Sequence, residues 1–74
     1  MTYEEALKRA KELKPNIDAC EEYNDAWMFK CKAEEWDIGG AGACVILKEN
    51  GKALNQVDYY DLYEAKHIRG FDIK

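Results

Sequence analysis

The apolar run ACVIL at residues 43–47 restricts the fold of this 74-residue chain more than any other segment. It is apolar at successive positions and β-branched in its middle, which is typical of a strand that is covered on both faces or lies centrally in a sheet. The segment ENGK follows at 49–52, and Asn-Gly between two such runs is the strongest short-range signal of a hairpin. The sequence therefore predicts a turn with positive φ at Asn50 and Gly51, followed by a partner strand over 52–57.

Two further strands are predicted before this hairpin. Residues 17–23 mix apolar and acidic side chains, which favours a strand at the edge of a sheet. Asn24 and Asp25 supply a turn, and apolar residues then alternate with polar ones from Trp27 to Ala33. This second strand should therefore be half-buried, with one polar face.

A helix is predicted over residues 3–14. Thr2, followed three positions later by Glu5, gives a capping box, and apolar residues then recur at helical spacing. Pro15 should end this helix, because proline disfavours helical geometry at the residue before it.

A second helix is predicted after the hairpin. Asp58 can begin it, with Asp61 at the third following position, and Gly70 can end it. The residues expected to face the core are Leu62, Tyr63, Ala65 and Ile68.

This order of elements predicts a single α+β domain over residues 1–74. We expect a four-stranded antiparallel meander, with the N-terminal helix and the short C-terminal helix packed on one of its faces. A chain of this length buries only roughly 60% of its unfolded surface when it folds, so its margin of stability is thin. A homodimer is therefore an open alternative to a monomer.

Acidic residues are concentrated in one segment of the chain. Residues 18–37 contain seven acidic residues against two lysines, and the whole chain has a net charge of −4. A surface of this sign repels the phosphate backbone of nucleic acids and attracts a basic protein. The alternative is a solvated acidic face that only keeps a small domain soluble.

The sequence shows no pattern of an export signal or a membrane span. Its first residues lack a basic region followed by an apolar one, and its longest apolar run has five residues. Three cysteines at spacings of eleven and thirteen do not make a disulfide framework. These features predict a cytoplasmic protein with reduced cysteines.

No catalytic or cofactor motif stands out either. The glycines at 39, 40 and 42 precede a strand, and no Lys-Ser or Lys-Thr follows them, which favours a bend entering a sheet over a phosphate-binding loop. Serine is absent, and the only threonine is the helix cap. Adjacent glutamates on a strand point to opposite faces, which defeats the shared geometry of acid and base catalysis. We therefore expect a protein that is not an enzyme and uses no cofactor.

Three cysteines and one histidine could in principle bind zinc. They are Cys20, Cys31, Cys44 and His67. Structural zinc sites nearly always contain two ligands that are two to four residues apart, and this set offers no such pair. Nothing in the sequence activates one cysteine as a nucleophile. The favoured interpretation is that the cysteines are small buried residues on strands, and no metal site is predicted.

The best candidate for a partner-binding surface combines acidic and aromatic residues. Its members are Glu21, Glu22, Glu34, Glu35 and Asp37, with Trp36 as the apolar anchor in the middle. Exposed Trp and Tyr beside acidic groups are typical of protein-binding surfaces, and Tyr59 and Tyr60 cannot both face the core. Trp36 could alternatively fold back as a lid over the end of the sheet. The first interpretation predicts a basic protein partner.

Three segments resemble the small bacterial proteins of the immunity protein 35 family. They are TYEEALKRAKEL at 2–13, NDAWMFKC at 24–31 and GGAGACVILKENGKAL at 39–54. This chain has Ala43 where family members often carry proline, and its segment 58–74 does not match the family pattern. The resemblance implies a cytoplasmic protein that binds and neutralises a toxin domain. The alternative is a small bacterial domain, monomeric or dimeric, whose role these residues do not identify.

Overall fold

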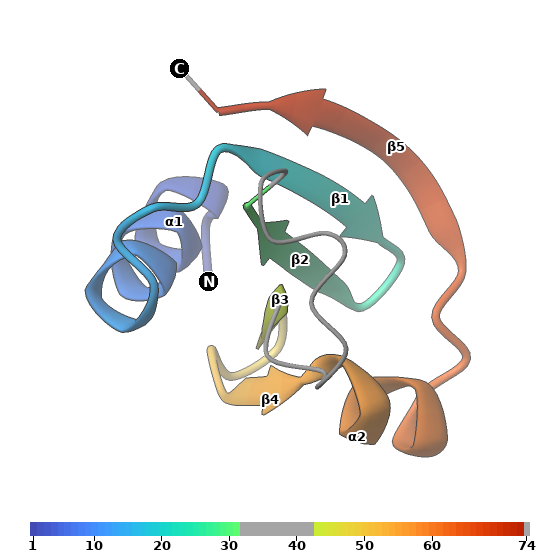
Figure 1. Ribbon diagram of the computed structural model, residues 1–74. Coiled ribbons are helices and arrows are strands. Elements are labelled where there is room, and N and C mark those ends of the chain that lie inside the picture. The colour runs from blue at the N-terminus through green and yellow to red at the C-terminus, as the bar shows by residue number, and fades with distance from the viewer. Residues whose placement is uncertain (32–42, 74) are drawn as a thin grey trace.

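Two helices and five strands form the parts of the chain that the computed structural model describes, residues 1–31 and 43–73 (Figure 1). In chain order they are α1 (Tyr3–Leu13), β1 (Ala19–Tyr23), β2 (Ala26–Lys30), β3 (Ala43–Leu47), β4 (Ala53–Asn55), α2 (Gln56–Leu62) and β5 (His67–Asp72). The strands form one antiparallel sheet in the order β4-β3-β2-β1-β5. The α+β class is confirmed, and the predicted number of strands is one too few. Neither described helix is long and apolar enough to cross a membrane.

The first helix forms as predicted. The Thr2 hydroxyl accepts a hydrogen bond from the Glu5 amide at 3.2 Å, and the Glu5 carboxylate accepts one from the Thr2 amide, which completes the capping box. The helix ends at Leu13, so that Lys14 alone separates it from Pro15.

The two helices pack on opposite faces of the sheet, so the prediction that both cover one face is wrong. The core under α1 contains Ala6, Ala10, Trp27, Phe29 and Ile46. The core under α2 contains Tyr59, Met28, Val45 and Leu47. Side chains of β2 and β3 enter the two cores in turn, because successive residues of a strand point to opposite faces. The strand at 43–47 is therefore covered on both faces.

β1 and β2 also differ from their predictions. Met28 is only 3% exposed and belongs to the core under α2, so β2 does not have the expected polar face. β1 lies between β2 and β5 and is therefore not an edge strand.

The largest difference concerns the C-terminal segment, where the sequence predicts one helix and the structure has a short helix followed by β5. The Asn55 side chain accepts a hydrogen bond from the Asp58 amide at 2.8 Å, so the helix begins before Asp58. Its last residue is Leu62. Ala65 then adopts a left-handed conformation with φ of 55°, which redirects the chain. Gly70 lies within β5 opposite Glu21 and does not end a helix.

The hairpin between β3 and β4 is confirmed, but its turn is longer than two residues. The Leu47 amide donates to the Lys52 carbonyl at 3.0 Å, and the Gly51 amide donates to the Leu47 carbonyl at 2.9 Å. Gly51 has the predicted positive φ, at 72°, whereas Asn50 does not. The Asn50 side chain instead accepts a hydrogen bond from the Lys52 amide at 2.9 Å.

Candidate functional site

The predicted partner-binding surface is only partly within the described residues. Glu34, Glu35, Trp36 and Asp37 lie outside them. Glu21 and Glu22 both lie on β1, where their side chains point to opposite faces of the sheet. The structure therefore does not bring these two carboxylates together on one surface.

Glu22 lies on the α1 face between two cations. Its carboxylate accepts hydrogen bonds from Lys48 Nζ at 2.8 Å and from Arg69 Nε at 2.9 Å. The Lys48 bond, and after it the Arg69 bond, lowers the pKa of the Glu22 carboxyl. The Lys48 ammonium also lies 5.2 Å from the centre of the Trp27 ring, a favourable cation–π distance. Glu22 therefore holds the Lys48 side chain on the α1 face.

Glu21 is paired on the opposite face. Its carboxylate lies 2.6 Å from His67 Nε2 and 3.3 Å from Lys30 Nζ. The hydrogen bond with His67 is the largest cause that lowers the pKa of the Glu21 carboxyl. A Cβ at Gly70 would overlap this carboxylate, so glycine leaves the space in which Glu21 lies. Both glutamates are thus engaged within the fold.

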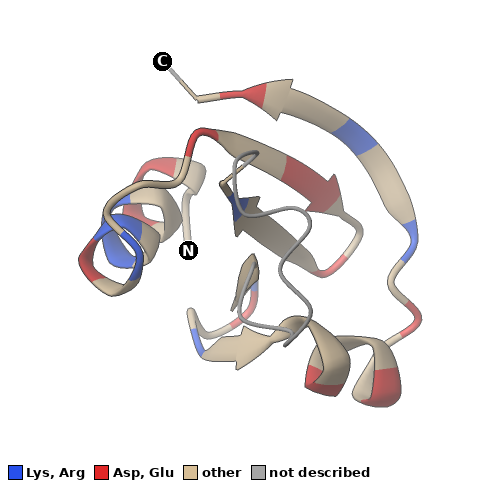
Figure 2. Cartoon of the chain, viewed as in Figure 1, with Lys and Arg blue, Asp and Glu red and all other residues tan. Residues whose placement is uncertain are grey.

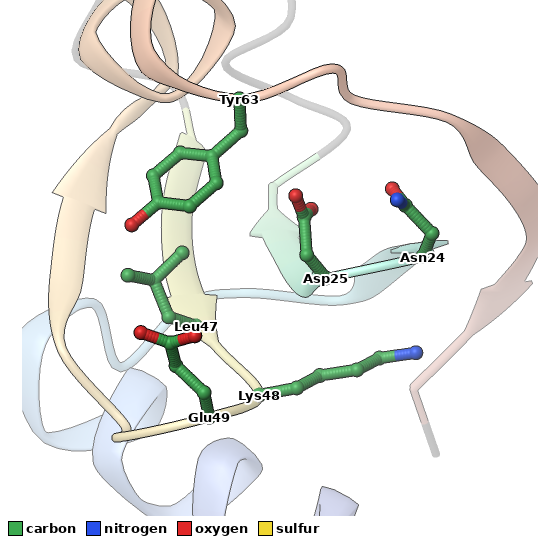
Figure 3. A pocket seen from close by; sticks show the side chains of 6 residues that line it. All are labelled: Asn24, Asp25, Leu47, Lys48, Glu49 and Tyr63. Atoms are coloured by element: carbon green, nitrogen blue, oxygen red, sulfur yellow. The ribbon is translucent and has the colours of Figure 1, made fainter.

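A pocket of about 290 Å³ opens at the end of the sheet where the β1–β2 and β3–β4 turns lie together (Figure 3). Its lining residues are Asn24, Asp25, Leu47, Lys48, Glu49 and Tyr63. None of these was singled out as a site residue from the sequence. The turn pattern was nevertheless a usable signal, since the first and third turns of an antiparallel meander lie at the same end of its sheet.

Hydrogen bonds tie the walls of the pocket to one another. The Lys48 amide donates to the Asp25 carbonyl at 2.9 Å, which joins the two turns. The Asn24 amide donates to the Lys66 carbonyl at 3.0 Å, and the Lys66 amide donates to Asn24 Oδ1 at 3.1 Å. The segment after α2 is thereby fastened to the β1–β2 turn, and the pocket is built from three connected segments.

Two tyrosines fix one side of the pocket. Tyr59 is fully buried, burial raises the pKa of its hydroxyl, and this hydroxyl donates to the Asp25 carboxylate. The Tyr63 ring stacks on Tyr59 with 5.6 Å between the ring centres. Figure 3 shows the Tyr63 hydroxyl directed toward Leu47 and Glu49. Asp25 and Tyr63 are therefore both positioned through Tyr59.

The charge of the pocket is negative. Asp25 and Glu49 contribute carboxylates, and neither forms an ion pair with any other residue in 1–31 or 43–73. Lys48 lines the pocket with its aliphatic stem, but its ammonium extends away from Glu49 and Tyr63 (Figure 3) and reaches Glu22. The pairing of Glu22 with Lys48 therefore leaves the pocket acidic.

The helix α2, whose C-cap is the pocket residue Tyr63, has a similar charge. Figure 2 shows acidic but no basic residues along α2, and its sequence QVDYYDL contains Asp58 and Asp61. Its exposed apolar side chains are Val57 at 59%, Tyr60 at 46% and Leu62 at 70% exposure. The expectation that Tyr59 and Tyr60 do not both face the core is confirmed, because Tyr59 is buried and Tyr60 is exposed.

The cysteines lie in the interior. Cys20, Cys31 and Cys44 are buried and unpaired, as predicted. Burial raises the pKa of Cys20 to about 12 and also raises that of Cys44, so both are neutral thiols at physiological pH. Within the described parts of the chain, no group of three or more His, Cys, Asp or Glu residues could hold a metal ion.

The chain matches no family model, no curated protein and no solved structure. The resemblance to the immunity protein 35 family therefore stays a prediction.

Proposed function

We propose that this protein is a non-enzymatic binding module for a basic protein, and that the partner docks on its acidic end. The acidic end is formed by α2 and the adjoining pocket, and its charged residues are Asp25, Glu49, Asp58 and Asp61. A toxin domain is the kind of partner that the resemblance to immunity proteins implies, and such binding would occur in the cytoplasm.

One observation carries this proposal. Three large apolar side chains, Val57, Tyr60 and Leu62, are exposed on a helix of seven residues that also carries two aspartates. Single exposed apolar residues are common, but three within a helix of seven residues favour a surface that a partner covers. Asp61 forms no ion pair within the described residues, so its charge is available to a basic partner.

The proposed partner surface therefore differs from the one predicted from the sequence. Glu21 and Glu22 are paired with basic residues of the same chain and contribute little free charge. The segment with Glu34, Glu35, Trp36 and Asp37 stays a proposed part of the partner surface, with Trp36 as a proposed anchor.

A matched pair of double variants tests the proposal. Asp61→Lys with Leu62→Ala alters the acidic end, and Glu12→Lys with Leu13→Ala makes the same kind of change on α1, where Leu13 is 56% exposed. Partners are captured from the host lysate with wild type and both folded variants, at low and at high salt. We expect the α2 variant to lose a salt-sensitive basic partner that the α1 variant retains. Equal capture by all three proteins would contradict the proposal.

The outer edge of β5, which carries no partner strand within residues 1–31 and 43–73, favours a homodimer as a second candidate. β5 has six residues and pairs only with β1 in the described sheet. Its outer edge can accept another strand, and a second copy of β5 would extend the sheet across a two-fold axis. Sedimentation velocity over a concentration series decides this question. A single monomeric species at all concentrations would exclude the dimer.

A further inference from the structure

We infer that the pocket between the two turns receives one cationic side chain, a lysine or an arginine, of a basic partner. This inference rests on the proposed function and specifies the chemistry of one contact within it. The residues that would receive the side chain are Asp25, Leu47, Glu49 and Tyr63.

The first argument is charge. Asp25 and Glu49 belong to different turns, and the pocket lies between them (Figure 3). A cation in the pocket would meet carboxylates from two sides, whereas an anion would be repelled by both. The only basic residue in the lining, Lys48, has its ammonium engaged by Glu22 at 2.8 Å on the other face of the sheet.

The second argument is shape. The pocket volume of about 290 Å³ lies just below the range of roughly 300–1,000 Å³ that is usual for small-molecule and cofactor sites. The Tyr63 ring, packed beside the buried Leu47, offers apolar surface to a methylene stem, and the carboxylates offer acceptors to its charged end. Long side chains with an apolar stem and a cationic end combine these two requirements.

The third argument is that contacts within the fold hold the walls of the pocket in place. Asp25 accepts the Tyr59 hydroxyl, and Tyr63 stacks on the same Tyr59 ring. Backbone hydrogen bonds join the two turns. A rigid pocket binds a side chain with less loss of conformational freedom than a mobile one.

Glu22 is a positioning residue in this arrangement, because it holds the Lys48 ammonium away from the pocket. If Glu22 becomes neutral, the Lys48 ammonium loses its partner and can turn back toward Asp25 and Glu49. Glu22→Gln should therefore weaken cation binding although Glu22 does not line the pocket. The double variant Glu22→Gln with Lys48→Gln should restore binding, because it removes the competing cation as well.

The experiment is an NMR titration of the ¹⁵N-labelled protein with hexa-arginine and hexa-lysine peptides at low salt. Amide shifts should concentrate at Asn24, Glu49 and Tyr63. Glu49→Gln should weaken binding about fivefold, and the control Glu12→Gln on α1 should leave it unchanged. The two peptides show whether a guanidinium or an ammonium is preferred, and Nα-acetyl-arginine methylamide shows whether one side chain alone produces the same pattern of shifts.

Three results would overturn the inference. They are shifts located away from the pocket, equal binding by Glu49→Gln and Glu12→Gln, and failure of Lys48→Gln to restore the Glu22→Gln variant. If one of these is seen while the Asp61→Lys, Leu62→Ala variant still loses the peptide, the pocket inference fails and the proposed function stands. If wild type and all variants bind the peptides equally, or none binds, both fail.

Discussion

Gly51 and Ala65 form a matched pair that tests how the local backbone sets the stability of this fold. Both residues are left-handed, with φ of 72° at Gly51 and 55° at Ala65. This conformation costs a residue with a Cβ about 1–2 kcal/mol, and glycine avoids the cost. Gly51→Ala introduces the cost, while the stiffer unfolded chain offsets about 0.4–1 kcal/mol of it. The expected net loss in the free energy of unfolding is about 1 kcal/mol.

The surroundings of Gly51 add little to this loss. A new Cβ would overlap the end of the Met1 side chain and would lie 3.6 Å from Arg9 Nη1. Met1 is 40% exposed and can move aside at little cost. The distance to Arg9 is an ordinary contact, so the 2.7 Å hydrogen bond from Arg9 to the Gly51 carbonyl can stay. Gly51→Val adds a β-branched side chain at the same φ, so it should cost more, about 2–3 kcal/mol.

Ala65→Gly is the control with the opposite sign. It removes the strain of a left-handed alanine and adds freedom to the unfolded chain, so we expect a gain of about 0–1 kcal/mol. Urea titrations measure the change in the free energy of unfolding for both variants, provided that they share one m-value with wild type. A change of about 1 kcal/mol corresponds to a shift of about 4–8 °C in Tm for a domain of this size. If Gly51→Ala is as stable as wild type while Ala65→Gly is clearly less stable, the reasoning from φ is refuted.

Further predictions concern Glu21 and the cysteines. The pKa of Glu21 is lowered in the fold, so its contribution to stability is complete above the ordinary value of 4.5 and is lost as the pH falls through the lower folded pKa. Urea titrations from pH 7 to pH 3 should show this loss in the free energy of unfolding, and Glu21→Gln should make the loss smaller. If the loss at acidic pH is the same in Glu21→Gln as in wild type, Glu21 is not its source. Gly70→Ala should displace the Glu21 carboxylate from His67, and the NMR chemical shifts of the His67 ring should then differ from those of wild type. The buried thiols should react with a disulfide reagent only as fast as the protein opens, which a rapid stoichiometric reaction of the native protein would disprove.

Features whose signals lie within a few residues were predictable from the sequence. The capping box at Thr2, the end of α1 before Pro15 and the left-handed Gly51 all belong to this group. β5 was not predictable in this way, because it pairs with a strand that is remote in the chain. Its residue Arg69 pairs with Glu22, at a sequence separation of 47. Residues 58–70 have a capping residue and apolar spacing that suit a helix. The end of this segment forms a strand instead because it can pair with the side of β1 that β2 leaves free. The placement of the two helices on opposite faces of the sheet was not predictable for the same reason. It is decided by contacts with strands that are remote in the chain.

The candidate site shows why charge counted along a sequence does not locate a charged surface. Glu21 and Glu22 are adjacent in an acidic segment, but the alternation of β1 separates them, and residues from other strands and turns pair with both. One of these partners, Lys48, would otherwise bring a positive charge to the pocket that it lines. Because Glu22 engages Lys48, the carboxylates of Asp25 and Glu49 keep their negative charge in the pocket, beside the aspartates of α2. In the proposed complex, Glu22 would thus act on the partner through Lys48, the cation that it withdraws from the pocket.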